Sequence, residues 1–383
     1  MASLLTFEEA QERVLAATRP LPSELVPIAE AGGRVIAEDA RARVDLPPFA
    51  SSAMDGFAVR AADLPGTLPI VGESAAGSPL GGSLQPGSAA AISTGAVVPH
   101  GADCVVPVEH VVVHDNRVDI PTAPTPGANV RPRGGDIAAG DVVVRARVRL
   151  TAAHIAAAAA TGIAVLPCAR RPRVSVLATG SELVAPGTDL RDGQIYESNT
   201  VMLAAALAGA GADVEPQAPA ADDEVALRDA LERGLAADVL VTSGGVSVGE
   251  HDLVRAAERE LGVEEVFWRV SMKPGKPIAF GVRGETLVFG LPGNPVSALV
   301  GCELFVKPAL LALQGLADPR PRFQPGRLSS MLRRDPERDE FVRARSQVED
   351  DAVVLVPVVG QESHMIARSS AADALVHVPR GNE

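Results

Sequence analysis

Large aromatic side chains are scarce in this chain of 383 residues: aromatics make up 3%, with one Trp and one Tyr. Its cores must be built from small aliphatic side chains, because hydrophobic residues still reach 46%. Cysteine is equally rare. Cys104, Cys168 and Cys302 lie far apart and match neither a zinc-ligand spacing nor a disulfide framework. The sequence therefore predicts a protein of a reducing compartment, the cytoplasm, without structural zinc or disulfides.

Positive charge is in deficit, with 35 Lys and Arg against 48 Asp and Glu and a formal net charge of -13. This balance argues against nucleic acid as the main partner, and any anion site must be locally basic. A basic N-terminal region followed by an apolar one is also lacking, so we expect no signal peptide. The most apolar segment, Ile155–Leu166, is too short to span a bilayer. We expect it to be a packed helix, and we expect no membrane association.

The length exceeds what one core usually supports, which predicts about two to four domains. Apolar positions at helical spacing predict a first helix over Thr6–Ala17. The stretch 46–140, rich in Gly and Pro, predicts an all-β module. Thr151 is placed to cap a helix, and Pro167–Pro172 marks a boundary. Beyond Pro319 short strands return, which predicts a small C-terminal β module.

Between Arg173 and Gln314, apolar strand runs alternate with segments of helical period, a pattern typical of a doubly wound, mainly parallel α/β sheet. The expected strands are Val174–Ala178, Asp213–Glu215, Val239–Thr242, Ile278–Gly281 and Thr286–Leu291. The expected helices are Thr200–Ala210, Asp223–Ala236, one from Asp252 and one from Val296. Ligands of such sheets bind beyond the carboxyl ends of the strands, so the residues after each strand are the candidate site.

Two of these loops carry polar residues on glycine turns. Thr179-Gly180-Ser181-Glu182 suits a ligand or metal contact, and suits equally an ordinary turn with capping residues. In Ser243-Gly244-Gly245-Val246-Ser247-Val248-Gly249, backbone N–H groups can converge on an oxyanion, although a Gly-rich loop alone is a weak signal. Asp252 lies just beyond this loop. It suits either Mg²⁺ or the positive end of a helix dipole.

Two further loops reach the same edge of the predicted sheet. In Met272-Lys273-Pro274-Gly275-Lys276-Pro277 the prolines restrict the backbone, which would fix both ammonium groups for an oxyanion. Solvated surface lysines are the alternative. In Leu291-Pro292-Gly293-Asn294-Pro295, Asn294 is expected to cap the next helix and Pro295 to occupy its first turn.

The β-rich region holds a second set of polar turns, at Ser51–Ala58, Ser93–Ala96 and Arg131–Asp136. Each alone fits a turn or a surface ion pair. Spacing alone does not bring them to the α/β site.

Taken together, the order, spacing and flanks of these motifs resemble the molybdopterin molybdenumtransferase family, the relatives of the gephyrin E domain. The resemblance runs from about residue 5 to residue 379. The segments that carry it are Pro47–Phe49, Ser52–Ala58, Thr94–Gly95, Arg131–Asp136, Ala178–Leu183, Ser243–Asp252, Lys273–Pro277 and Leu291–Ser297.

The resemblance implies four parts: a discontinuous helical segment (1–45 and 141–171), a β-rich lobe (46–140), an α/β molybdopterin-binding domain (172–318) and a C-terminal β barrel (319–383). It implies a homodimer in which the α/β core of one chain faces the β-rich lobe of the other. The enzyme that adenylylates molybdopterin is a further implied partner. The implied reaction consumes molybdate and adenylylated molybdopterin with Mg²⁺, releases AMP and leaves molybdenum on the dithiolene.

The resemblance also implies roles for matching residues. Glu182 and Asp252 would hold Mg²⁺, with Asp55 and Asp222 as further carboxylates. Molybdate would be oriented by Lys273, Lys276, Arg343 and Ser363. The loop with Ser243, Gly244, Gly245, Ser247 and Gly249 would cradle pterin or nucleotide phosphate. Further substrate contacts would come from Thr179, Gly180, Ser181, Arg131, Arg269, Pro292 and Pro295. Asp55, Thr94 and Asp136 would complete the partner's site.

Three positions depart from the family pattern. Arg269 stands where relatives often carry lysine, which keeps the charge with another geometry. Phe57 replaces a commoner tyrosine. The chain stops at Pro379–Glu383, where the pattern continues into one more strand, so we expect an open-edged barrel.

Three other functions stay open. Adenylylation of molybdopterin uses a similar α/β core, but the extra lobes favour the transferase. Tungstate insertion is also open, because the two oxyanions are nearly isosteric and no residue discriminates between them. A non-enzymatic scaffold like the gephyrin E domain is disfavoured, since the sequence shows no extended partner-binding linker.

Overall fold

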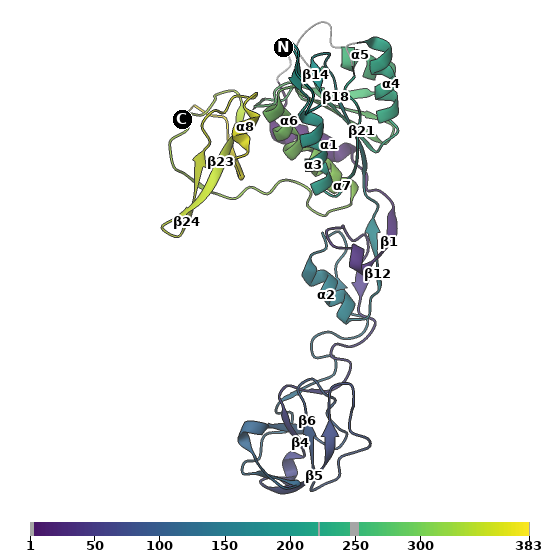
Figure 1. The fold of residues 1–383 in the computed structure, drawn as a ribbon, viewed down its shortest axis with the longest axis vertical. Coiled ribbons are helices and arrows are strands. Elements are labelled where there is room, and N and C mark those ends of the chain that lie inside the picture. Colours follow the sequence, from purple (N-terminus) through teal and green to yellow (C-terminus); the bar gives the residue numbers. More distant parts are fainter. Residues whose placement is uncertain (1–3, 221–222, 246–252, 383) are drawn as a thin grey trace. The chain divides into compact units, whose positions relative to one another are not determined.

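The chain forms two compact units in the computed structural model, which describes residues 4–220, 223–245 and 253–382 (Figure 1). One unit takes Leu25–Ala146 and Leu150–Cys168. The other takes Met1–Glu24, Arg147–Arg149 and Ala169–Glu383. We call them the β-rich unit and the α/β unit.

A six-stranded sheet of order β7-β4-β6-β5-β9-β8 dominates the β-rich unit. Its strands are β4 (Gly56–Val59), β5 (Gly66–Ser74), β6 (Ala89–Ile92), β7 (Cys104–Pro107), β8 (Val112–His114) and β9 (Arg117–Ile120), with the short turns η2 (Ala61–Asp63) and η3 (Val108–His110). Small side chains such as Ala58, Val59 and Val105 fill its cores. This all-β module agrees with the strand pattern predicted for the region.

Short strand pairs make up the rest of this unit: β1 (Ser23–Pro27) with β12 (Val165–Ala169), β2 (Ala40–Arg41) with β11 (Val142–Val144), and β3 (Ser51–Ser52) with β10 (Val130–Arg131). The helices are η1 (Ile28–Glu30) and α2 (Ala152–Ala160). Thr151 caps α2, as predicted, by accepting a hydrogen bond from the N–H of His154 at 3.5 Å. The prediction of one packed helix over Ile155–Leu166 is wrong. That segment is divided between α2, where Ala158 is the buried residue, and β12.

The α/β unit is built on a six-stranded sheet of order β16-β13-β17-β21-β20-β18. Its strands are β13 (Arg173–Ala178), β16 (Asp213–Pro216), β17 (Val239–Ser243), β18 (Glu264–Trp268), β20 (Ala279–Arg283) and β21 (Thr286–Leu291). The first four in this order are parallel neighbours, which confirms a mainly parallel sheet. β20 runs antiparallel to both of its neighbours, β18 and β21. For β21 the cause is the short link between Arg283 and Thr286, which are paired, because a two-residue link can join only antiparallel strands.

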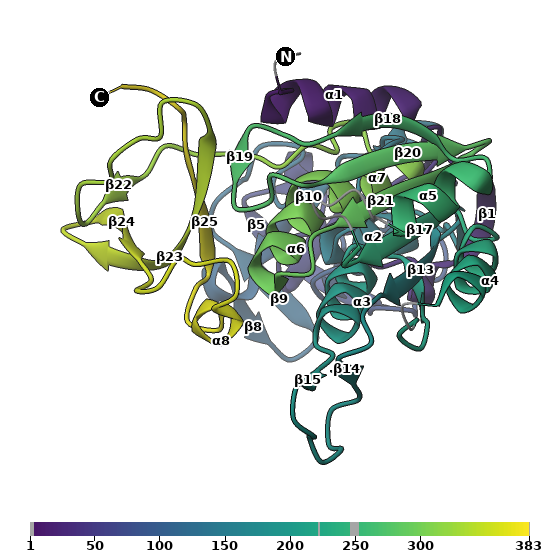
Figure 2. The same cartoon turned by 90° about the horizontal axis from the view of Figure 1, so that it is seen from above.

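Helices cover both faces of this sheet (Figure 2). One face packs against α1 (Phe7–Ala17), α3 (Asn199–Gly209) and the continuous helix of α6 (Pro295–Gly301), the π-helical η4 (Cys302–Val306) and α7 (Lys307–Leu313). The other packs against α4 (Glu224–Gly234) and α5 (Leu253–Glu260). In β17, Val239 and Val241 face the first layer and Leu240 faces the second. Burial on both faces explains why the central strands β13, β17 and β21 are mostly apolar.

One helix in the described part of the chain, Pro295–Leu313, is long and apolar enough to cross a membrane. Its apolar window is 72% buried inside the fold. A core helix of a folded domain has this combination of length and burial.

A C-terminal sheet is the second part of the α/β unit. Its strands are β22 (Arg327–Leu328), β23 (Asp339–Glu349), β24 (Ala352–Pro357) and β25 (Ala374–Val378), with the helical turn α8 (Ile366–Ser369). The short strand β19 (Met272–Lys273) joins this sheet by pairing with Asp339 and Glu340 of β23. The lysine-bearing turn is therefore tied to the C-terminal sheet.

Candidate functional site

A cavity of about 640 Å³ opens where the parallel strands β13, β17 and β21 end. Its walls come from the turn after β13, the start of α3, the loop after β17 and the loop after β21. The predicted site residues that line it are Thr179, Glu182, Ser243, Gly244, Gly245, Pro292 and Pro295. The structure thus brings three of the predicted loops together at one edge of the sheet.

Glycines let these loops approach backbone to backbone. Gly244 has a φ of 96°, and a Cβ there would lie 2.7 Å from the carbonyl oxygen of Thr179. The N–H of Thr179 donates to Ser243 O at 3.0 Å, and the N–H of Gly244 donates to Leu291 O at 3.1 Å. A larger residue at position 244 would be strained and would push the first loop away.

Asn199 braces the cavity from the first turn of α3. Its Nδ2 donates to Ser243 Oγ and to Gly293 O, each at 2.8 Å. Because a carbonyl can only accept, Gly293 fixes which end of the amide is the nitrogen. Asn199 is 8% exposed, so both bonds are shielded from water. Sequence reasoning missed this residue, since Asn at the start of a predicted helix looks like an ordinary cap.

The cavity wall is suited to an anion. Two helices, α3 and the long helix from Pro295, begin there, and helix N-termini carry partial positive charge. Within the described residues, the buried Thr179 Oγ1 and Asn199 Oδ1 have no hydrogen-bond partner. Unsatisfied buried polar atoms of this kind are often found where a ligand or ion binds.

Two carboxylates line this cavity: Glu197, whose Oε1 accepts a hydrogen bond from the N–H of Thr200 at 2.8 Å, and Glu182 in the turn after β13. We consider Glu182 first, because its side chain is exposed. It folds back over Gly180, where a Cβ would lie 2.6 Å from Glu182 Oε2. Its carboxylate makes no ion pair or hydrogen bond with any residue that the structure describes. No cluster of three His, Cys, Asp or Glu side chains suited to a metal occurs among the described residues. One free carboxylate still fits Mg²⁺, because substrate phosphates commonly supply its other ligands.

The two lysines lie beside the cavity and do not line it. Lys273 Nζ pairs with Glu340 Oε1 of β23 at 2.7 Å, while Pro277 reaches the cavity wall. Lys273 is therefore held by a carboxylate as well as by the prolines around it. Arg269 also lies off the cavity wall, with its guanidinium carbon 3.7 Å from the centre of the Trp268 ring. The roles of all three cations in substrate binding stay predictions.

The C-terminal sheet contributes a loop to the rim. Asn294 occupies the N-cap position of α6 as predicted, but its Nδ2 donates to Ser363 Oγ at 2.9 Å and forms no capping bond. The N–H of Val296 donates to Ser363 O at 3.0 Å, and His364 lines the cavity. Sequence reasoning also missed His364, which follows a predicted site residue.

Arg343 lies behind this loop and is 3% exposed. Its guanidinium donates to the carbonyls of Gly360 and Met365 at 2.7 and 2.9 Å and to Ser369 Oγ at 2.7 Å. Burial lowers the pKa of Arg343. In this arrangement Arg343 stabilises the loop that carries Ser363, and its contact with an oxyanion stays a prediction.

In the β-rich unit, the structure brings the turns of Asp55 and Thr94 together, while Arg131 lies in the short strand β10. Asp55 Oδ1 accepts a hydrogen bond from the N–H of Thr94 at 2.7 Å. Arg131 pairs with Ser51 across β10 and β3. Asp136 lies in a separate turn, where its N–H donates to Leu46 O at 2.9 Å. Asp222, Ser247, Gly249 and Asp252 lie outside the described residues.

Comparison with known proteins covers almost the whole chain. Molybdopterin molybdenumtransferase 2 of Mycobacterium tuberculosis is 39% identical to it over 99% of this chain and 96% of its own length. Molybdopterin molybdenumtransferase of Haemophilus influenzae is 36% identical over 95% of this chain and 92% of its own length. The chain belongs to the molybdopterin molybdenumtransferase family.

The regions of this family appear in order along the chain. Residues 5–162 match the MoeA N-terminal region (domain I and II), 175–312 the probable molybdopterin binding domain, and 325–383 the MoeA C-terminal region (domain IV). Two crystal structures of the molybdopterin biosynthesis MoeA protein of Pyrococcus horikoshii share the fold, with TM-scores of 0.83 and 0.85 and identities of 33% and 27%. Each comparison covers 100% of this chain, and 96% and 97% of those chains.

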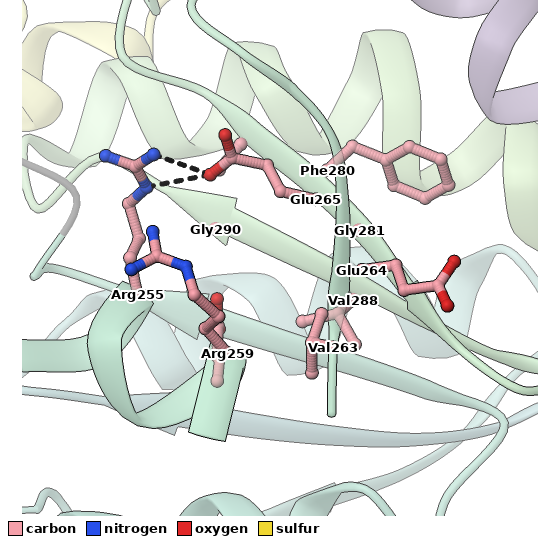
Figure 3. Close-up of a pocket in the computed structure, with 11 residues that line it drawn as sticks. Arg255, Arg259, Val263, Glu264, Glu265, Phe280, Gly281, Val288 and Gly290 are labelled. Atoms are coloured by element: carbon pink, nitrogen blue, oxygen red, sulfur yellow. Dashed lines mark hydrogen bonds and ion pairs between the residues drawn. The ribbon is translucent and has the colours of Figure 1, made fainter. Parts of the chain in front are cut away.

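A second cavity of this family member, of about 240 Å³, lies between α5 and the strands β18, β20 and β21 (Figure 3). Gly281 and Gly290 of the strands and Arg259 of α5 are among the residues that line it. Figure 3 shows Arg255 joined to Glu265 by two hydrogen bonds, at 2.6 and 3.0 Å. None of the predicted site residues lines it, so the cavity at the strand ends is the candidate active site.

Proposed function

We propose that the chain is the enzyme that inserts molybdenum in molybdenum cofactor biosynthesis. It converts molybdate and adenylylated molybdopterin into molybdenum-loaded molybdopterin and AMP. The main structural support is the cavity at the strand ends. The chain that forms it aligns over 99% of its length with a molybdopterin molybdenumtransferase. No feature of the cavity favours a scaffold or an adenylylating enzyme.

The nucleotide phosphate binds at the loop of Ser243–Gly245 and the N-termini of α3 and α6. These groups are fixed before substrate arrives, because the loops are joined backbone to backbone and braced by Asn199. Preorganised donors stabilise charge that develops on phosphate oxygens without the cost of reorienting water.

Glu182 would hold Mg²⁺ against the phosphates, with Asp252 as the second carboxylate expected from the sequence. Bound there, Mg²⁺ neutralises charge on the phosphoanhydride that is cleaved. Glu182 suits this role because it lines the cavity and its carboxylate pairs with no cation among the described residues. Molybdate binds beside this point. Lys273 releases Glu340 and pairs with the oxyanion instead. Lys276 and Ser363 complete the contacts.

The enzyme works as a cytoplasmic homodimer. Asp55, Thr94 and Asp136 of one chain complete the cavity of the other, and the adenylylating enzyme delivers the substrate. Support for this comes from the β-rich unit, where a hydrogen bond joins the exposed polar turns of Asp55 and Thr94.

The test supplies purified protein with adenylylated molybdopterin and Mg²⁺ and follows AMP over a range of molybdate concentrations. AMP release that rises with molybdate and saturates supports the proposal, and a tungstate series shows whether the site separates the two oxyanions. Release that is independent of molybdate, or no release, would refute the proposal.

A further inference from the structure

The segment Glu182–Glu197, here called the arm, leaves the sheet after β13 and returns to the start of α3. Its two short strands, β14 (Leu183–Val184) and β15 (Ile195–Tyr196), pair with each other. At its base the N–H of Ile195 donates to Glu182 O at 3.0 Å and the N–H of Glu197 donates to Val184 O at 2.8 Å. Figure 2 shows the arm projecting beyond α3. These bonds hold the base of the arm together, and its residues Glu182, Leu183, Ile195, Tyr196 and Glu197 line the cavity.

Tyr196 lies on the cavity side of the arm. It is the one tyrosine of a chain with 3% aromatics, and it lines the cavity while 45% exposed. Its hydroxyl donates to Thr188 O at 2.9 Å, which anchors the far end of the side chain. Among the ring contacts of the described residues, none involves Tyr196. An anchored ring without an aromatic partner thus borders a polar cavity.

We propose that Tyr196 is a specificity residue whose ring stacks on a planar nitrogen heterocycle of the substrate. This rests on the proposed function, in which a heterocycle is joined to a phosphate bound at Gly244 and Gly245. Adenine and pterin are both such rings, and an aromatic side chain stacks on either because stacking requires only a π face. The phosphate site supplies affinity for the charge, and Tyr196 adds preference for phosphates that carry a ring.

The anchoring bond explains why tyrosine is suited to this position. A ring held at its hydroxyl loses little further freedom when a ligand stacks on it, so less of the stacking free energy is lost to ordering. Ile195 precedes it with 54% exposure and belongs to the same wall. Leu190, at 47% exposure, is on the arm but does not line the cavity.

The experiment measures binding by calorimetry with three probes: AMP, a phosphorylated 6-hydroxymethylpterin, and ribose 5-phosphate, which has no ring system. Tyr196→Ala should weaken binding of AMP or of the pterin probe by about tenfold or more and leave ribose 5-phosphate unchanged. The probe that loses affinity identifies the stacked ring. Tyr196→Phe should stay within about threefold of the wild type, because the ring remains. Leu190→Ala is the matched control and should bind every probe as the wild type does.

Three results would overturn the inference: unchanged binding of both ring probes by Tyr196→Ala, an equal loss for ribose 5-phosphate, or a loss in Tyr196→Phe as large as in Tyr196→Ala. Far-UV circular dichroism of each variant checks that the fold is kept. Because no molybdate is present, these results are independent of the AMP-release assay. A wild type that shows ring-dependent binding without molybdate-dependent AMP release would refute the proposed reaction and leave the stacking role standing.

Discussion

Some residues of the cavity hold its loops in place, and others are placed to bind the reacting groups. Asn199 is buried, and its side-chain amide donates hydrogen bonds to Ser243 at the end of β17 and to Gly293 in the loop after β21. Glu182 faces the same cavity with its carboxylate oxygens unpaired by any described residue. A substitution of Asn199 should therefore change the shape of the site, whereas a substitution of Glu182 should change its chemistry.

Glu182→Gln should reduce molybdate-dependent AMP release by about 100-fold or more, because a neutral amide is a poor Mg²⁺ ligand. The midpoint of thermal unfolding should stay within about 2 °C, since the side chain is exposed and unpaired. Initial rates at saturating Mg²⁺ measure the effect. Glu182→Asp is the control and should recover part of the rate as Mg²⁺ is raised. Wild-type rates in Glu182→Gln would remove Glu182 from the metal site.

Asn199→Ala should lower the free energy of unfolding by about 1 to 3 kcal/mol, because it leaves Ser243 Oγ and Gly293 O without their donor. The loops it joins should then bind phosphate less tightly, so KM for adenylylated molybdopterin should rise. Asn199→Asp keeps the shape but loses both donors and adds a negative charge at an anion site. Its KM should rise further than that of Asn199→Ala, and an unchanged KM in both would contradict the bracing role.

At the scale of elements, the cavity depends on three loops whose backbones touch. Gly244 allows this contact, since its φ of 96° and its distance to Thr179 leave no room for a side chain. The long helix from Pro295 and α3 then present their N-termini to one space. The positive charge at the cavity therefore comes from the two helix N-termini, and few charged side chains are needed to supply it.

Gly244→Ala should lower the free energy of unfolding by about 1 to 3 kcal/mol and sharply weaken AMP binding, because its methyl group would meet backbone atoms of Thr179. Gly209→Ala, near the end of α3, is the matched control. A Cβ at Gly209 meets nothing within 4 Å, so this change should be neutral or slightly stabilising. Urea unfolding and calorimetry measure both effects. Equal behaviour of the two variants would mean that the close loop contact does not matter.

The elements that sequence reasoning recovered are those with a local signal. β13, β17 and β21 are apolar runs buried on both faces, and α1 and α2 have side-chain caps, so each could be predicted. The direction of β20 and the existence of β18 were missed, because both depend on a short connection and on pairing between strands of the sheet. Asn199 and His364 were missed because their importance lies in contacts with segments distant along the chain.

At the scale of the whole molecule, ion pairs between distant segments stabilise the α/β unit. Asp238, just before β17, accepts two hydrogen bonds from Arg170 at 2.8 and 2.9 Å and one from the N–H of Arg173 at 2.7 Å. Burial raises the pKa of Asp238, but the bonds from Arg170 and Arg173 outweigh it and leave the pKa below its ordinary value of 3.8. The resulting stability is present above pH 3.8 and is lost as the pH falls through the lower folded value.

Asp238→Asn should accordingly lower the free energy of unfolding by about 1 to 3 kcal/mol at neutral pH. Its difference from the wild type should shrink below pH 3.8, where the unfolded carboxyl is protonated. Fluorescence of Trp268, the one tryptophan, follows unfolding of the same unit. Asp318→Asn breaks an exposed pair with Arg322 and should change stability by about 0.5 kcal/mol or less. A pH-independent loss in Asp238→Asn would contradict the ionic explanation.

The central claim, that this chain places molybdenum on molybdopterin, is tested most directly by a stoichiometry. Adenylylated molybdopterin is incubated with the protein, Mg²⁺ and molybdate, after which AMP is measured by chromatography and pterin-bound molybdenum by mass spectrometry. We expect one molybdenum bound for each AMP released, and neither product when molybdate is left out. AMP release without bound molybdenum, or bound molybdenum without AMP, would contradict the claim.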